Sequence, residues 1–375
     1  MTAPRVPAAR IPQLELLRVI ATGSIFLYHL WTVIPLSSNA SVPGLVLAQV
    51  PLLGTLGVIV FNCITGFVLA LPYLGHHHPR PIPGSLSFFR RRFGRLCLYY
   101  YPVLVLWTIP WLVLAVQEQG WLLVLLAVAA HVVFVHTLHA STFFAIVPAF
   151  WWLGMLAQFY LVCPWLLQCF ERLGAGRTCV LACVIPWAVW IVLTHLADQF
   201  PGSTLAMVHY LSYFNLPVRL PEFALGMWLA SAWNRGVPLV YGHQRATAPP
   251  GIIMMLMRPL LVGVILFLLL QRTFMQHFAH PFGHIYLVFW CVCSVLAVLR
   301  WWLASQLGRL RLSADLAATS YGIYLLHQPL LDYANQWLAD IFSPASRFLV
   351  LLIGIGLLCY HAAVGLNSLV ERLWR

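Results

Sequence analysis

Three ionisable side chains lie in the first hydrophobic segment of the chain, where charge is costly. They are Glu15, Arg18 and His29. Arg18 and His29 are 11 positions apart (29 − 18), which on a helix is about 20° past three full turns and about 16 Å along the axis. The two residues therefore share a helix face, with a fixed cation at one end and a titratable base at the other. Ionisable groups inside membrane spans are functional candidates, and this pair suggests anion binding and general base catalysis.

Glu15 is close enough along the helix to pair with Arg18. Glu15 precedes Arg18 by three residues, and residues three apart are neighbours on a helix. A structural interpretation stays open beside the functional one. In that case Arg18 extends to the membrane surface, and His29 only makes a hydrogen bond inside the bundle.

A second group of polar side chains lies near the C-terminus, in the segment SYGIYLLHQP at 320–329. Tyr321, Tyr324 and His327 recur at every third residue and drift along one side of a helix, which Pro329 is expected to kink. A neutral imidazole beside phenols can orient a substrate or pass a proton. The alternative is an aromatic stripe that packs the bundle.

Two further charged groups have both a functional and a structural interpretation. Arg219 and Glu222 lie three residues apart around a proline, as a self-neutralising pair or as part of a cavity wall. Arg92 and Arg95 belong to a basic loop, RRRFGR at 90–95. That loop suits phosphate binding because guanidinium groups pair with phosphate oxygens, or it serves as a topology anchor.

The composition places these residues in a membrane protein. The chain has 375 residues, of which 62% are hydrophobic and 8% are charged, against about 25% charged in soluble domains. The net charge of +12 comes from arginines in short loops, so no basic face for nucleic acid is expected. The adjacent His76, His77 and His78 cannot all face one metal ion, and no metal site is expected.

Eleven hydrophobic segments are candidates for spans of about 20 residues. They are 14–36, 48–73, 96–116, 120–138, 148–169, 179–197, 211–232, 253–271, 284–299, 317–338 and 346–369. Loop arginines mark the cytoplasmic side, and they stay on one side only if 120–138 is a re-entrant segment or a buried half-span. We therefore predict a single all-α domain, 1–375, with about ten spans and both termini in the cytoplasm.

Taken together, these motifs resemble the acyltransferase type 3 family of membrane-bound O-acyltransferases. Arg18 and His29 match its signature of an arginine and a histidine separated by ten residues. The segments GTLGVIVFNCITGFVL (54–69), FRRRFGR (89–95), RLPEFALG (219–226) and SYGIYLLHQP (320–329) are similar to four further signatures in the same order. The resemblance covers nearly the whole chain.

The chain departs from the family pattern in one segment, WWLGMLAQFYLVCP at 151–164. Leu156 stands where many members have a glutamate, and Trp152 where they have a serine. A proline that usually follows the basic loop closely is also late, at Pro102.

The resemblance implies transfer of an acyl group, commonly acetyl, from cytoplasmic acyl-CoA to a hydroxyl, often of a sugar in the bacterial cell envelope. In this hypothesis His29 is the general base or its direct partner, and Arg18, supported by Glu15, positions the thioester or the phosphates. Acyl-CoA is a donor substrate, with no permanently bound cofactor. Arg92 and Arg95 bind CoA phosphates. The acceptor is bound by four residues: Tyr324, His327, Arg219 and Glu222.

Two other functions remain open from the residues alone. Charged groups at mid-membrane also mark the substrate pathway of a transporter or a lipid or glycan flippase, although no inverted repeat of the kind that many transporters contain is evident. A scaffold subunit of an envelope-assembly complex is the other alternative. Loss of Arg18 or His29 would then affect little beyond folding.

Overall fold

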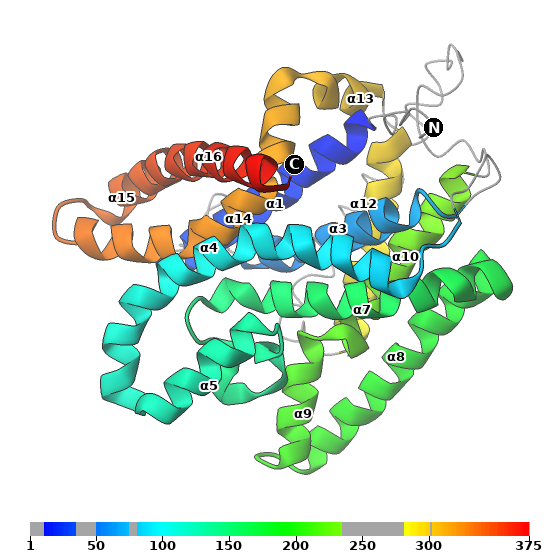
Figure 1. Ribbon diagram of the computed structural model, residues 1–375, viewed down its shortest axis with the longest axis horizontal. Helices are drawn as coiled ribbons and strands as arrows, with labels where there is room; N and C mark the ends of the chain where they lie inside the picture. Colours follow the sequence, from blue (N-terminus) through cyan, green and yellow to red (C-terminus); the bar gives the residue numbers. More distant parts are fainter. Residues whose placement is uncertain (1–10, 35–49, 75–80, 235–280, 301, 375) are drawn as a thin grey trace, which may run out of the picture.

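The computed structural model describes residues 11–34, 50–74, 81–234, 281–300 and 302–374. Within these ranges the chain forms helices joined by short connections, with no strand (Figure 1). The predicted all-α polytopic architecture is confirmed. The predicted span 253–271 and the histidines His76–His78 lie outside the described residues.

The helices follow the predicted hydrophobic segments closely. Their bounds are α1 Pro12–Val33, α3 Val50–Ala70, α4 Ser85–Gln119, α5 Trp121–Val132, α6 Ala140–Phe143, α7 Trp151–Arg172, α8 Ala175–Gln199, α9 Thr204–Tyr213, α10 Leu216–Asn234, α12 Pro281–Arg300, α13 Trp302–Arg309, α14 Arg311–Leu338, α15 Pro344–Val350 and α16 Gly356–Trp374. A short π-helix, Leu351–Ile355, joins α15 to α16 and makes one continuous element of 31 residues.

Six helices in the described part are long and apolar enough to cross a membrane, judged by length and composition alone. A seventh results if α12 and α13, which are bent by 78° relative to each other, count as one broken span. Helices α10 and α14 are not among these six. With 19 and 28 residues, they are nevertheless long enough to span a membrane. Both contain the polar motifs identified in the sequence, and this lowers their hydropathy. The total of ten crossings stays a prediction.

The predicted basic loop before the third span is wrong. Arg90, Arg91, Arg92 and Arg95 lie in the first turns of α4, which begins at Ser85 instead of near residue 96. The helix extends further because apolar side chains recur on one face of this segment, with Phe88 and Leu96 both buried. An amphipathic pattern of this kind stabilises a helix even when its other face is charged.

The segment predicted to be re-entrant contains only a short helix. Helix α5 has 12 residues, fewer than a full span requires. The backbone then leaves the helical path at Phe134, and again at Ile146, both of which have a positive φ. It returns through the 3-10 turn Pro148–Phe150 into α7.

Glycines allow the central helices to approach at backbone distance. A Cβ at Gly66 of α3 would lie 2.1 Å from the carbonyl oxygen of Phe223, and one at Gly226 of α10 would lie 1.9 Å from that of Cys63. On the other side of α3, Gly54 accommodates the ring of Tyr28 from α1. Small residues at helix crossings are typical of membrane bundles. The glycines of the predicted motifs therefore fix the positions of α1, α3 and α10.

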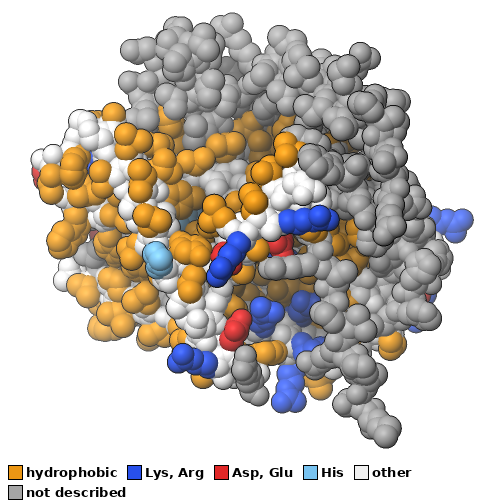
Figure 2. Space-filling model, turned by 90° about the horizontal axis from the view of Figure 1, so that it is seen from above, with side chains coloured by type: hydrophobic (Ala, Val, Ile, Leu, Met, Phe, Trp, Pro, Cys, Tyr) orange, Lys and Arg blue, Asp and Glu red, His pale blue; other side chains and the backbone are white. Residues whose placement is uncertain are grey.

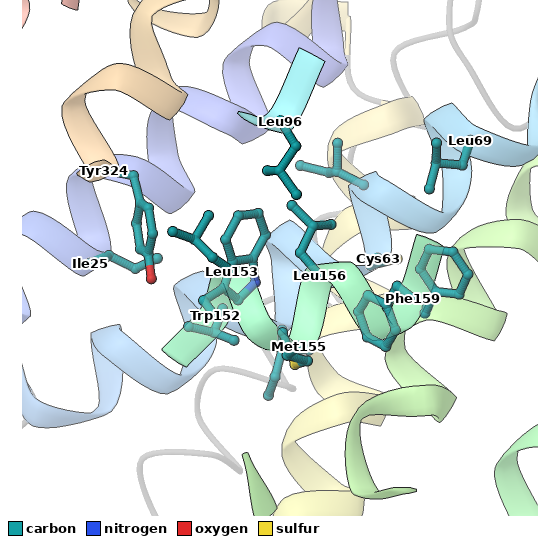
Figure 3. Packing of buried hydrophobic residues seen from close by; sticks show 14 of the residues in the cluster. Ile25, Cys63, Leu69, Leu96, Trp152, Leu153, Met155, Leu156, Phe159 and Tyr324 are labelled. Carbon is teal, nitrogen blue, oxygen red and sulfur yellow. The ribbon is translucent and has the colours of Figure 1, made fainter. Parts of the chain in front are cut away.

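Helix α1 packs against α3 and α14, and α14 packs against α16. Helix α7 lies beside this group and contributes buried apolar side chains to its core, as Figure 3 shows for Leu153, Leu156 and Phe159. Leu156, which stands where many members of the resembled family have a glutamate, is 3% exposed. The core at this point is therefore apolar.

Candidate active site

The two histidines predicted from separate motifs lie against each other. The ring centroids of His29 in α1 and His327 in α14 are 4.9 Å apart, with the ring planes at 62°. His327 is buried and His29 is half-buried. Tyr28 and Phe26 of α1 pack edge-on and tilted against these two rings. The contact between α1 and α14 therefore pairs two imidazoles, one from the first helix and one from a helix near the C-terminus.

The position of the ring proton on His327 follows from a contact inside its own helix. Nδ1 of His327 lies 2.7 Å from the carbonyl oxygen of Tyr324. A carbonyl oxygen only accepts hydrogen bonds, so Nδ1 carries the proton of the neutral ring and Nε2 carries the lone pair. Nε2 is buried and has no hydrogen-bond partner among the described residues. His327 thus presents a basic nitrogen in the neutral state.

Two side chains of α14 also bind the backbone of Ala149, just before the start of α7. The hydroxyl of Tyr324 donates a hydrogen bond to the carbonyl oxygen of Ala149. The side-chain oxygen of Gln328 accepts one, at 2.7 Å, from the N–H of the same residue. Both polar groups of Ala149 are therefore bound by one helix, which fixes the 3-10 turn before α7 next to His327.

Arg219 and Glu222 form an ion pair at the centre of the bundle. Nη1 of Arg219 donates to Oε1 of Glu222 at 2.9 Å, and the two side chains are 2% and 0% exposed. Nε2 of His284, from α12, lies 2.9 Å from the same oxygen. The guanidinium group also donates to the carbonyl oxygen of Tyr213 and lies 4.3 Å from the centroid of its ring. A buried charge that is paired and hydrogen-bonded avoids the cost of an uncompensated charge.

An asparagine and a tryptophan connect this ion pair to the histidine pair. Nδ2 of Asn62 donates to Oε2 of Glu222 at 2.6 Å, and Oδ1 of Asn62 accepts the indole N–H of Trp152 at 2.9 Å. The Trp152 ring lies 5.3 Å from that of Tyr324, on the side of α7 that faces α14 (Figure 3). The structure therefore links Glu222 to His327 through three intervening side chains, those of Asn62, Trp152 and Tyr324.

Sequence reasoning missed Asn62, His284 and the role of Trp152. The signal for Asn62 and His284 was available, because each is a polar residue inside an apolar segment and such residues are expected to face the bundle interior. Trp152 stands where many members of the resembled family have a serine. Its indole N–H donates a hydrogen bond to Asn62.

The predicted arginines gather at the other end of α1. The charge of Arg18 interacts with those of Glu15 and Arg95, and Tyr160 of α7 interacts with Arg92 and Arg95. Arg18 and Arg92 are half-buried, and Arg95 is exposed. Figure 2 shows arginine side chains gathered on one face of the molecule. We call Arg18, Arg92 and Arg95 the arginine group, and its guanidinium groups suit a ligand that carries several phosphates.

The structure therefore divides the predicted site residues into three sets. The histidine pair lies with Tyr324. The buried ion pair of Arg219 and Glu222 is connected to Tyr324 through Asn62 and Trp152. The arginine group lies with Glu15 at the far end of α1. Among the described residues, no group of three or more His, Cys, Asp or Glu side chains is placed to hold a metal ion.

The long apolar helices, with polar side chains buried between them, define an integral membrane protein. A family described as an acyltransferase domain matches residues 11–364, nearly the whole chain. The protein therefore belongs to the acyltransferase type 3 family, as its motifs predict, and is a membrane acyltransferase of that general kind. No curated protein and no solved structure matches the chain.

Proposed function

We propose that this protein transfers an acyl group, most simply acetyl, from acyl-CoA to a hydroxyl of an envelope glycan or another acceptor outside the cytoplasm. The contact between His29 and His327 is the observation that carries this proposal. It places two imidazoles at the end of α1 opposite the arginine group. The donor's phosphates would bind at the arginine group, and its thioester would reach the histidine pair.

The reaction is a single acyl transfer. The acceptor oxygen attacks the thioester carbonyl carbon, a C–O bond forms and the C–S bond breaks. The hydroxyl proton passes to the general base, and the CoA thiolate leaves and takes up a proton to become the thiol. The products are the ester and free CoA. A base is required because a sugar hydroxyl does not ionise unaided near neutral pH.

In this proposal His29 is the base, and His327 is its neighbour with a fixed tautomer. The half-buried ring of His29 is accessible to an acceptor. Nε2 of His327 can accept a hydrogen bond from the acceptor hydroxyl or from His29 itself. Tyr324 holds His327 through its backbone carbonyl oxygen and the start of α7 through its hydroxyl. It is therefore a positioning residue.

The proposed orientation puts both termini and the arginine group in the cytoplasm, where acyl-CoA is found. His29 then lies about 16 Å deeper along the helix axis. The acceptor would approach from the opposite face, so donor and acceptor meet at the histidine pair. A bacterial inner membrane suits this arrangement.

The test is acyl transfer from labelled acetyl-CoA to a pool of envelope glycans by the purified protein in nanodiscs. His29→Ala is expected to lower turnover by about 10²- to 10⁴-fold, with the protein still inserted and monodisperse. His361→Ala is the matched control, because this exposed histidine of α16 has a ring contact only with its neighbour Tyr360 among those described. Full turnover in His29→Ala would remove the base assignment.

A further inference from the structure

Two tyrosine hydroxyls are buried between the arginine group and the histidine pair. The hydroxyls of Tyr100 in α4 and Tyr321 in α14 have no hydrogen-bond partner among the described residues. Tyr100 is fully buried as a side chain. Neighbouring tyrosines do have partners, since Tyr101 donates to the carbonyl oxygen of Val132 at 2.9 Å and Tyr324 donates to Ala149. Other buried polar atoms also have no partner among the described residues, such as Trp107 Nε1 and Thr108 Oγ1 of α4, but these two are the tyrosine hydroxyls of that set.

These hydroxyls belong to a continuous row. Tyr321 lies one helical turn before Tyr324 on α14, and its ring packs edge-on against that of Tyr99, the residue before Tyr100 in α4, with the centroids 5.3 Å apart. Tyr321 is also within electrostatic range of Tyr160 and Tyr100. At one end Tyr160 interacts with Arg92 and Arg95 of the arginine group. At the other end the ring of Tyr324 lies 5.7 Å from that of His327. We call Tyr160, Tyr100, Tyr321 and Tyr324 the tyrosine row.

A buried hydroxyl without a partner costs free energy, because it has lost its hydrogen bonds to water. A phenylalanine would fill the same space without that cost. The chain nevertheless has tyrosine at both positions. This pattern is expected where the missing partner is a polar group of a ligand.

We propose that the hydroxyls of Tyr100 and Tyr321 bind the amide-bearing pantetheine arm of the thioester donor, between its phosphates and its acyl group. The inference rests on the proposed function. An extended phosphopantetheine arm spans a length comparable to the separation of Arg18 and His29, about 16 Å along the helix. Its two amides and its hydroxyl supply the donors and acceptors that the tyrosine hydroxyls lack.

The experiment measures binding of two probes to the full-length protein in nanodiscs. One probe is a non-transferable thioether analogue of acetyl-CoA, and the other is adenosine 3′,5′-bisphosphate, which lacks the arm. Tyr321→Phe and Tyr100→Phe are each expected to weaken binding of the analogue about three- to tenfold, as loss of one hydrogen bond does. Binding of the nucleotide fragment is expected to stay unchanged.

Unfolding midpoints distinguish a ligand contact from a structural role. Because neither hydroxyl has a protein partner among the described residues, both variants are expected to unfold at the wild-type temperature or above it. Tyr101→Phe is the matched control. It removes a hydroxyl that does have a protein partner, so it is expected to lower the midpoint and leave binding of the analogue unchanged.

Three outcomes overturn the inference. Unchanged affinity for the analogue in both variants would mean that the hydroxyls do not touch the donor and at most hold water. Equal weakening of both probes would place the effect at the nucleotide end. If the wild-type protein binds neither probe, the proposed function fails, and the inference fails with it.

Discussion

The side chains of Asn62 and Trp152 are joined by a 2.9 Å hydrogen bond, from the indole N–H to the amide oxygen. The two residues come from α3 and α7, and each has a second partner of a different kind. Asn62 donates to the carboxylate of Glu222, whereas Trp152 packs on the ring of Tyr324. This single bond therefore connects the charged centre of the bundle to the aromatic surroundings of the histidine pair.

Replacement of Asn62 by leucine is expected to lower the free energy of unfolding by about 2–4 kcal/mol, because it leaves the Trp152 N–H and one Glu222 oxygen without their partner. Trp152→Phe removes only the N–H, and about 1–2 kcal/mol is expected. Thermal unfolding in nanodiscs measures both. Asn367→Leu serves as the control, since that half-buried amide donates to the Ala318 carbonyl oxygen and makes no described contact with Asn62, Trp152 or Glu222. A loss no larger than in this control would show that the network is not fully formed.

Arg219→Leu is expected to destabilise the protein by about 3–5 kcal/mol, because Glu222 would remain charged and buried without its cation. Adding Glu222→Gln in the same chain should recover part of this loss. The charge is then gone, while an oxygen remains to accept from Asn62. The exposed pair Arg311 and Asp315, with its atoms 3.8 Å apart, is the contrasting case. Arg311→Leu should change the unfolding midpoint very little. No recovery in the double variant would contradict the uncompensated-charge explanation.

Gly226→Ala is expected to destabilise the protein by about 1–3 kcal/mol or more. The added methyl group would lie 1.9 Å from the Cys63 carbonyl oxygen, and a backbone atom cannot rotate away. Gly365→Ala in α16 is the matched control, because nothing lies within 4 Å of its Cβ position. That change should be neutral or stabilising, by up to about 1 kcal/mol. The two variants compared by thermal unfolding test whether α3 and α10 touch at the backbone.

The double variant Arg92→Ala and Arg95→Ala is expected to raise KM for acyl-CoA by roughly tenfold, while kcat changes little. Both residues are accessible to solvent, so the wild-type KM should also rise with added salt as the charges are screened. In the double variant this salt dependence should be weaker. Arg177→Ala, an exposed arginine at the start of α8, is the control. A fall in kcat without a change in KM would argue against phosphate binding at this position.

The sequence indicated the individual site residues better than their partners. Polar groups inside apolar segments are conspicuous, so Arg18, His29 and His327 could be identified one by one. The contact between His29 and His327 could not be predicted, because the two residues are 298 positions apart (327 − 29). Helical periodicity shows which face of a helix is apolar, but it contains no information about which other helix packs on that face.

The ends of helices were less predictable than their centres. Arginines interrupt the hydrophobic pattern in the first turns of α4, so the apolar segment expected from the sequence began only at residue 96. Phe88 and Leu96 nevertheless keep one face of those turns against the core. The short α5 could be anticipated from the distribution of arginines between the two sides of the membrane. The positive φ at Phe134 and Ile146 could not, because neither residue type favours that conformation.

The direct contact between α3 and α10 at Gly66 and Gly226 also bears on how the bundle can move. Two helices that meet at the backbone have no intervening layer of side chains whose rotamers could absorb a sliding motion. They should therefore move as one body, which carries Asn62 and Glu222 together through any conformational cycle. Any rearrangement that admits or releases a substrate must then occur at other helix contacts. The contact between α1 and α14, which contains the ring contact between His29 and His327, is where such motion should be sought first.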